Sequence, residues 1–226
     1  MDKQHLAIAI DGPSGAGKST IARLLAADLR FIYVDTGALY RAVGYTMLQE
    51  GIDPADAAAV EERLPELQVE LRYVDGVQRV FVNDEDVSDC IRTPEVSMAA
   101  SAVSALPVVR QFLLQLQRDL AASSNVIMDG RDIGTVVLPD AGLKIFLTAS
   151  PEERARRRYL ELQEKGVDTT LEAVLEDMRQ RDHNDSNRAA APLKAAEDAV
   201  MVDTTGCSLE EAVERMKKLA KERIGK

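Results

Sequence analysis

Long hydrophobic runs are missing from this sequence, and cysteine is scarce. The apolar run near the N-terminus, Leu6–Ile10, is far too short for the apolar core of a signal peptide or for a membrane span. The two cysteines, Cys90 and Cys207, have no CxxC motif or Cys/His cluster around them. This argues against a disulfide framework and against a structural zinc site, and reduced thiols suit the cytosol. We therefore expect a cytoplasmic protein with no membrane partner.

Basic residues are also in the minority, with 28 Lys and Arg against 38 Asp and Glu and a formal net charge of −10. The whole molecule is therefore not a general binder of polyanions, and any phosphate site must be a local basic patch. Aromatic residues make up only 4% of the chain, and none interleave with its arginine-rich stretch, Arg154–Arg158. Because single-stranded nucleic acids bind by stacking on aromatic rings, we expect no nucleic-acid partner.

The apolar pattern predicts an α/β fold. A chain of 226 residues can form one large domain, or one domain that carries an insertion. Short apolar segments alternate with helical patterns, which is typical of a central parallel sheet covered by helices on both faces. We expect strands at Leu6–Ile10, Phe31–Val34, Val126–Met128, Leu143–Leu147 and Val200–Val202, helices at 18–29 and 107–121, and helix starts with capping boxes at Ser150 and Ser208.

One segment departs from this pattern. Residues Leu67–Val82 alternate apolar and polar side chains on either side of Asp75-Gly76, which is a strong signal for an antiparallel hairpin. A hairpin inside an α/β chain suggests a small inserted subdomain of about residues 65–100. The core would then comprise residues 1–64 and 101–226.

The strongest motif is a glycine-rich loop between the first strand and the first helix. Its residues match GxxxxGK[ST] in full: Gly12, Pro13, Ser14, Gly15, Ala16, Gly17, Lys18 and Ser19. Glycines let successive backbone N–H groups turn onto phosphate oxygens, and the helix N-terminus adds its positive end. Lys18 reaches the β- and γ-phosphates, and the Ser19 hydroxyl can hold Mg²⁺. We expect residues 12–20, which include Thr20, to bind the phosphates of a nucleoside triphosphate.

A magnesium site also needs a carboxylate, and the ends of strands are where such folds place their ligands. Asp11 and Asp129 both follow apolar runs. We predict Asp129 as the metal carboxylate, together with Ser19. The alternative is that Asp129 caps the turn that follows it, as Asp before Gly often does.

Several further motifs together resemble bacterial cytidylate kinases. They are Asp35–Arg41, Ile91–Val96, Asp129–Thr135, Phe146–Ser150 with the Glu-Glu-Arg-Ala that follows Pro151, and Arg181–Leu193. The resemblance runs from Ile8 to the C-terminal helix. It implies a P-loop kinase core, a nucleotide-monophosphate-binding insert at about 65–100, and an arginine-rich helical lid at about 150–188. It also implies a (d)CMP kinase of pyrimidine nucleotide metabolism, which uses Mg²⁺ and ATP to convert CMP or dCMP into CDP or dCDP. We expect a monomer.

The resemblance also implies the roles of individual residues. The residues expected to bind CMP are Thr36, Arg41, Ser101, Arg110, Arg131, Asp132, Arg181, Asp185 and Arg188, and the expected catalytic residues are Lys18, Arg131 and Arg188. Thr36 stands where some members of the family have serine. The carboxylate of Asp132 could accept the exocyclic amine of cytosine, or it could be a structural cap or a salt-bridge partner of Arg131. The resemblance does not assign which lid arginine reaches the phosphates.

Three other functions compete with this interpretation. A P-loop kinase that acts on another small molecule is the nearest. A GTPase switch would need a guanine-reading NKxD segment, which the sequence lacks. A nucleic-acid motor would usually be larger and more basic.

Overall fold

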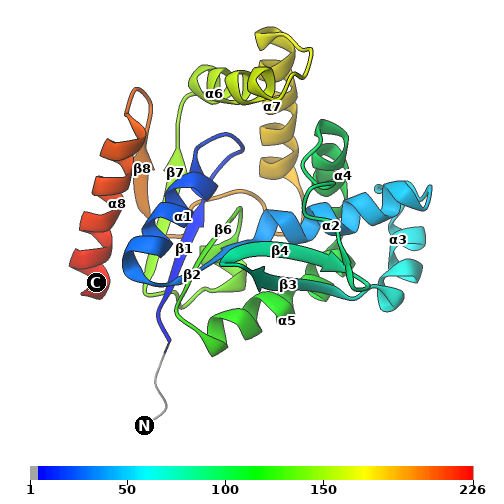
Figure 1. The fold of residues 1–226 in the computed structure, drawn as a ribbon, viewed down its shortest axis with the longest axis horizontal. Helices are drawn as coiled ribbons and strands as arrows, with labels where there is room; N and C mark the ends of the chain where they lie inside the picture. The colour runs from blue at the N-terminus through cyan, green and yellow to red at the C-terminus, as the bar shows by residue number, and fades with distance from the viewer. Residues whose placement is uncertain (1–4, 226) are drawn as a thin grey trace. The chain divides into compact units, whose positions relative to one another are not determined.

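The computed structural model describes residues 5–225 (Figure 1). The described chain forms two compact units. One comprises the segments up to Tyr33 and from Ser124 onward, and the other is Val34–Ser123.

The first unit is built on a five-stranded sheet. Its order is β2–β6–β1–β7–β8, with bounds Ile32–Asp35, Val126–Gly130, Ala7–Asp11, Leu143–Thr148 and Val200–Asp203. Strand β1 pairs in parallel with both β6 and β7, so that Ile8 lies beside Ile127 on one side and Leu143 on the other. The predicted parallel α/β sheet is confirmed, and each strand lies within one or two residues of its predicted bounds.

Helices α1 (Lys18–Leu29) and α8 (Leu209–Ile224) pack on this sheet in a shared apolar core. Leu25 of α1, Met216 of α8 and Ile145 of β7 are all buried there. Helices α6 (Pro151–Glu164) and α7 (Leu171–Asn187) pack against each other around a small apolar cluster of their own, which includes Ala155 and Met178.

The two predicted capping boxes have different outcomes. At α8, the Ser208 hydroxyl accepts the N–H of Glu211 and the Glu211 carboxylate accepts the N–H of Ser208, so the box is complete. At α6, the Ser150 hydroxyl accepts the N–H of Glu153, as predicted. The prediction of a reciprocal hydrogen bond from the Ser150 N–H to the Glu153 side chain is wrong. The N–H of Ser150 donates to the hydroxyl of Thr205 at 2.9 Å instead, because the chain leaving β8 brings that residue alongside the helix start.

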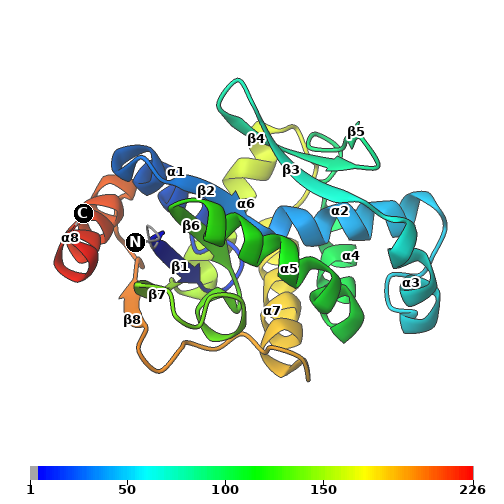
Figure 2. The same cartoon turned by 90° about the horizontal axis from the view of Figure 1, so that it is seen from below.

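The second unit combines helices with the predicted hairpin (Figure 2). Its elements are α2 (Thr36–Gln49), α3 (Ala57–Arg63), a 3₁₀ turn (Leu64–Glu66), β3 (Val69–Val74), β4 (Val77–Val82), β5 (Glu85–Asp86), α4 (Pro94–Ser104) and α5 (Pro107–Ser123). Asp75 and Gly76 at the hairpin turn both have positive φ, 52° and 78°, as a two-residue type I′ turn requires. The compact unit that holds the hairpin is wider than residues 65–100, since α2, α4 and α5 share one apolar core with β3 and β4.

In the described part of the chain, no single helix is long and apolar enough to span a membrane. One bent pair, Pro94–Ser104 with Pro107–Ser123, passes that test of length and composition only when its two helices are joined across a 97° bend.

Candidate active site

The glycine-rich loop lies where strand β1 leads into helix α1, and all three of its glycines have conformations that other residues rarely adopt. Gly12 has φ of 150°, and a Cβ at this position would lie 1.9 Å from the carbonyl oxygen of Leu147. Gly17 has φ of 87° and caps the N-terminus of α1 without a side chain. The first N–H groups of α1 therefore receive no hydrogen bond from a capping side chain at Gly17. They lie at the end of the helix that carries partial positive charge, and this end favours bound anions.

Lys18 is the first residue of α1 and is buried. Its Nζ donates to the carbonyl oxygen of Pro13 at 2.7 Å, so the side chain folds back over the loop. Burial, and after it the positive charge of Arg131, lowers the pKa of Lys18 from 10.5 to about 7. A polyphosphate bound in the loop would supply the negative charge that restores the ammonium form.

Asp11 and Asp129 lie at the carboxyl ends of β1 and β6, where the parallel register pairs Asp129 with Ile10 and Asp11 with Gly130. The Oδ2 of Asp129 accepts the Ser19 hydroxyl at 2.8 Å, and its Oδ1 accepts the Tyr33 hydroxyl at 2.8 Å. Ser19 and Asp129 thus bring a hydroxyl and a carboxylate together, and these are the hard oxygen ligands that Mg²⁺ prefers. The two predicted metal ligands fit such an ion.

The turn after β6 is capped by Asp11. The two carboxylate oxygens of Asp11 accept the N–H groups of Ile133 and Gly134 at 2.7 and 2.8 Å. Burial raises the pKa of Asp11 from 3.8 to about 6, against the lowering effect of these two hydrogen bonds. Asp11, at the end of the neighbouring strand β1, therefore provides a cap for this turn.

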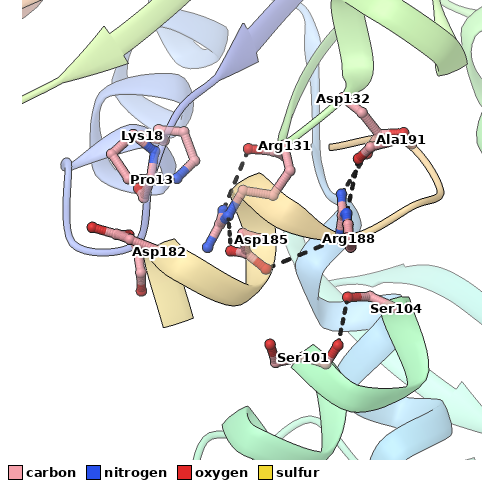
Figure 3. A network of polar contacts seen from close by, with 12 residues as sticks. Pro13, Lys18, Ser101, Ser104, Arg131, Asp132, Asp182, Asp185, Arg188 and Ala191 are labelled. Atoms are coloured by element: carbon pink, nitrogen blue, oxygen red, sulfur yellow. Dashed lines mark hydrogen bonds and ion pairs between the residues drawn. The ribbon is translucent and has the colours of Figure 1, made fainter. Parts of the chain in front are cut away.

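Arg131 and Arg188 pair with carboxylates in the same close-up view as Pro13 and Lys18 of the loop (Figure 3). The Nε of Arg131 donates to Oδ2 of Asp185 at 2.8 Å, and Arg188 lies 3.6 Å from Asp132 and 4.0 Å from Asp185. Burial opposes the charge of Arg131, but Asp185 more than offsets it and raises the pKa above its ordinary value. The salt-bridge partner considered for Asp132 was Arg131, whereas the partner in the structure is Arg188.

The C-terminal part of α7 supplies the remaining members of this cluster. Arg181 lies one turn before Asp185 on that helix. Burial acts to raise the pKa of the Asp185 carboxyl, but Arg131, and after it Arg188 and Arg181, lower the pKa below its ordinary value. Arg188 caps the C-terminus of α7, and its Nε donates to the carbonyl oxygen of Ala191 at 2.8 Å. The guanidinium of Arg188 is therefore oriented from two sides.

Two arginines of the predicted lid are engaged with the rest of the first unit. Arg154 donates to the carbonyl oxygens of Ser14 and Ala149 and to the carboxylate of Asp182. Arg157 donates to the carbonyl oxygen and the hydroxyl of Thr204 at 2.9 and 3.3 Å.

In the second unit, the start of α2 presents the first predicted CMP-binding residues. Thr36 is buried at the first position of the helix, and Arg41 follows in its second turn. Asp35 caps the helix by accepting the N–H of Ala38 at 3.0 Å, and its carboxylate lies 3.8 Å from Arg41 and 3.2 Å from Arg92. One buried carboxylate thus holds two arginines beside the first turn of the helix.

The other predicted residues of this unit lie on α4 and α5. The Ser104 hydroxyl donates to the carbonyl oxygen of Ser101 (Figure 3), and the carbonyl oxygen of Ser104 accepts Nη1 of Arg110 at 3.3 Å. The guanidinium of Arg110 also lies over the ring of Tyr40, 5.5 Å from its centroid. Arg110 is therefore held in place rather than being a solvated surface arginine.

Sequence reasoning missed several partners of the predicted residues. Tyr33, Asp35 and Arg92 were not singled out, and neither was Asp182. Asp35 carried a usable signal, because an aspartate directly before a helical pattern is a preferred N-cap. Arg92 and Asp182 lie within the motifs Ile91–Val96 and Arg181–Leu193 that carry the resemblance, but no local pattern assigns a partner to them or to Tyr33, since each meets its partner only after the chain has folded.

Comparison with known proteins gives the following matches. Residues 8–222 match the family described as Cytidylate kinase. The chain is 52% identical over 212 residues to the cytidylate kinase of Caldicellulosiruptor bescii, covering 94% of each chain. It is 50% identical over 222 residues to that of Desulfitobacterium hafniense, covering 98% of this chain and 95% of the relative. The crystal structure of an uncharacterized protein from Eubacterium ventriosum superposes with a TM-score of 0.51 at 12% identity, over 95% and 97% of the two chains, which supports the fold alone.

Proposed function

This chain belongs to the cytidylate kinase family, and on that premise we propose that it transfers the γ-phosphate of ATP to CMP or dCMP, giving ADP and CDP or dCDP. The observation that carries the proposal is the pairing of a phosphate-binding loop with a cluster of oriented arginines in the same compact unit. Lys18 belongs to the loop, and Arg131 and Arg188 form the cluster.

The donor side of the reaction is proposed for residues 12–20. The backbone N–H groups of the loop and the start of α1 would bind the phosphates of ATP, and Lys18 would contact the β- and γ-phosphates. Enzymes that use ATP in this way work with a divalent metal, which neutralises phosphate charge. We propose Mg²⁺ as this metal, with Ser19 and Asp129 as the protein groups that hold it, directly or through water.

Phosphoryl transfer needs little covalent help from a protein, so positioning and charge neutralisation are most of the task. Arginine suits this role because its planar fork offers two parallel hydrogen bonds to a phosphate. Asp185 fixes the guanidinium of Arg131 through Nε, so its orientation is set before an anion arrives. We propose that Arg131 and Arg188 stabilise the transferring phosphoryl group and the acceptor phosphate.

The acceptor side is proposed for the nine residues that match the family's CMP-binding motifs: Thr36, Arg41, Ser101, Arg110, Arg131, Asp132, Arg181, Asp185 and Arg188. Among them Asp132 is our candidate for reading the base. A carboxylate can accept the exocyclic amine of cytosine, and it would face the carbonyl oxygen of uracil with no proton to share. Such a site can reject the unmatched analogue by as much as ~10⁴-fold.

A panel of acceptors tests the proposed reaction. The purified chain is incubated with Mg²⁺, ATP and one of CMP, dCMP, UMP or AMP, and formation of ADP and of the nucleoside diphosphate is followed by chromatography. We expect the highest kcat/KM with CMP or dCMP. A higher value with AMP, UMP or a non-nucleotide acceptor would refute the substrate assignment, and turnover stimulated by single-stranded nucleic acid would favour a motor instead.

Replacement of Asp132 by asparagine tests how the base is read. The asparagine amide keeps the shape of the carboxylate but adds an N–H donor, which suits the carbonyl oxygen of uracil. For the Asp132→Asn variant we expect the KM for CMP to rise, the KM for ATP to change little, and the preference for CMP over UMP to fall by about 10-fold or more. Asp140→Asn, at an exposed position of the same segment, is the matched control. An equal rise in both KM values would make Asp132 a structural residue.

A further inference from the structure

Arg154 is the first arginine of the predicted lid helix α6, yet its side chain is only 4% exposed and is directed into the protein. All three of its guanidinium nitrogens have partners. Nε donates to the carbonyl oxygen of Ala149 at 3.0 Å, Nη1 to that of Ser14 at 3.0 Å, and Nη2 to the carboxylate of Asp182 at 2.6 Å. One buried cation thus joins the end of β7, helix α7 and the phosphate-binding loop.

Packing around the next residue of the loop is equally close. Gly15 has φ of 73°, and a Cβ at this position would lie 2.4 Å from the terminal methyl of Met178. It would also lie 3.2 Å from the Cβ and the carbonyl oxygen of Arg154. The loop therefore rests against α6 and α7 at the place where Arg154 contacts it, with no room for a side chain between them.

The bond to Ser14 has a consequence for the neighbouring amide. A trans peptide unit is planar, and its N–H points away from its C=O. When Arg154 holds the carbonyl of Ser14, the N–H of Gly15 points in the opposite direction within the same peptide plane. The backbone N–H groups of such a loop donate hydrogen bonds to phosphate oxygens.

We propose that Arg154 is a positioning residue for the phosphate-binding loop: it holds the carbonyl of Ser14 so that the N–H of Gly15 faces the bound phosphates. Asp182 is part of the device, because it neutralises and orients the buried guanidinium. This arrangement also ties the predicted lid helices to the loop, so that a shift of α7 is transmitted to the amides that bind phosphate. The proposal rests on the proposed function, because it assumes a triphosphate in the loop.

The obvious alternative is that Arg154 binds a phosphate directly, as a lid arginine would. Replacement of its partner separates the two roles. In the Asp182→Asn variant the arginine remains charged but loses its anchor. A direct phosphate contact predicts equal or tighter binding of the triphosphate, whereas a positioning role predicts weaker binding.

The experiment measures the Kd of the β,γ-imido analogue of ATP by isothermal titration calorimetry, together with the unfolding midpoint in urea. The variants are Arg154→Met, which keeps the buried stem, and Asp182→Asn. Arg179→Met is the matched control, since Arg179 also joins α7 to α6, through Glu152, but at an exposed position. We expect Kd to rise about 10-fold for Arg154→Met and several-fold for Asp182→Asn, and to stay unchanged for Arg179→Met; a 10-fold rise corresponds to about 1.4 kcal/mol.

Each outcome decides the matter. A lower unfolding midpoint with an unchanged Kd makes Arg154 merely structural, and tighter binding by Asp182→Asn makes it a phosphate ligand; either overturns the proposal. Should Arg154→Met fail to fold, Asp182→Asn alone decides between the same results. A wild-type protein that does not bind the analogue refutes the proposed function as well, whereas binding that is equal in all variants refutes only the positioning role.

Discussion

At the scale of single residues, Lys18 shows how burial shapes the proposed chemistry. The side chain lies close to Pro13, Arg131 and Asp129, and its pKa of about 7 means that a large fraction is neutral at physiological pH before nucleotide binds. A bound triphosphate adds several negative charges beside the amine. Because an opposite charge favours the ammonium form, binding must raise the pKa of Lys18 again.

This coupling predicts proton uptake. At pH 8 we expect binding of the β,γ-imido analogue of ATP to take up about one proton, and at pH 6, where Lys18 is already protonated, almost none. Calorimetric titrations in buffers of different ionisation enthalpy measure the number directly. Lys18→Ala should abolish the uptake and lower kcat by at least about 10²-fold while leaving the fold intact. Uptake that persists in this variant would place the titrating group elsewhere.

At the scale of elements, helices α2 and α4 approach each other through a glycine. A Cβ at Gly44 of α2 would lie 2.9 Å from the backbone nitrogen of Ala100 and 3.0 Å from the carbonyl carbon of Ala99. Two effects oppose each other here. Alanine is favoured over glycine in a helix by about 1 kcal/mol, but overpacking of a core costs about 1–3 kcal/mol. Since the obstructing atoms are backbone and cannot rotate away, the second effect should win.

We therefore predict that Gly44→Ala lowers the free energy of unfolding by about 1–2 kcal/mol, although it improves helix propensity. Urea denaturation followed by circular dichroism measures this change. Ala27→Gly is the control: because Ala27 is exposed on α1, this substitution measures the effect of helix propensity on stability without a change in packing. A Gly44→Ala variant more stable than wild type would mean that α2 and α4 can separate without loss.

At the scale of the whole molecule, the buried carboxyl of Asp11 makes the stability of this acidic chain depend on pH. Asp11 is buried near Lys18 and Asp132, and its pKa of about 6 exceeds the unfolded value of 3.8. The folded protein therefore holds this proton more tightly than the unfolded chain does. The contribution of Asp11 to stability is fully present below pH 4 and is lost as the pH rises through 6.

The expected effect is visible as a difference between two proteins. Between about pH 4 and pH 6, the free energy of unfolding of the wild type should fall by about 2 kcal/mol relative to Asp11→Asn, which has no proton to lose. Parallel urea titrations at several pH values measure this difference and cancel the carboxyls common to both proteins. A difference that does not change with pH would contradict the buried, proton-holding state of Asp11.

Much of the fold follows from local patterns that the chain carries along its length. Period-two alternation and the Asp75-Gly76 pair were sufficient for the hairpin, and short apolar runs were sufficient for the five parallel strands. The loop of residues 12–19 was recognisable because phosphate binding needs glycine, lysine and a hydroxyl at fixed spacing. Each of these features depends on residues close together in the sequence, and local sequence patterns are therefore sufficient to predict it.

The partners within the candidate site could not be found in that way. Ser19 meets Asp129 across 110 residues, Arg131 meets Asp185 across 54, and Arg154 meets Ser14 across 140. No local pattern distinguishes Asp185 from Asp132 as the partner of Arg131, or Asp11 from Asp129 as the cap of a turn. Strand register and helix packing select among equivalent charged groups, because the energy of a buried ion pair depends on distances that exist only once the chain is folded.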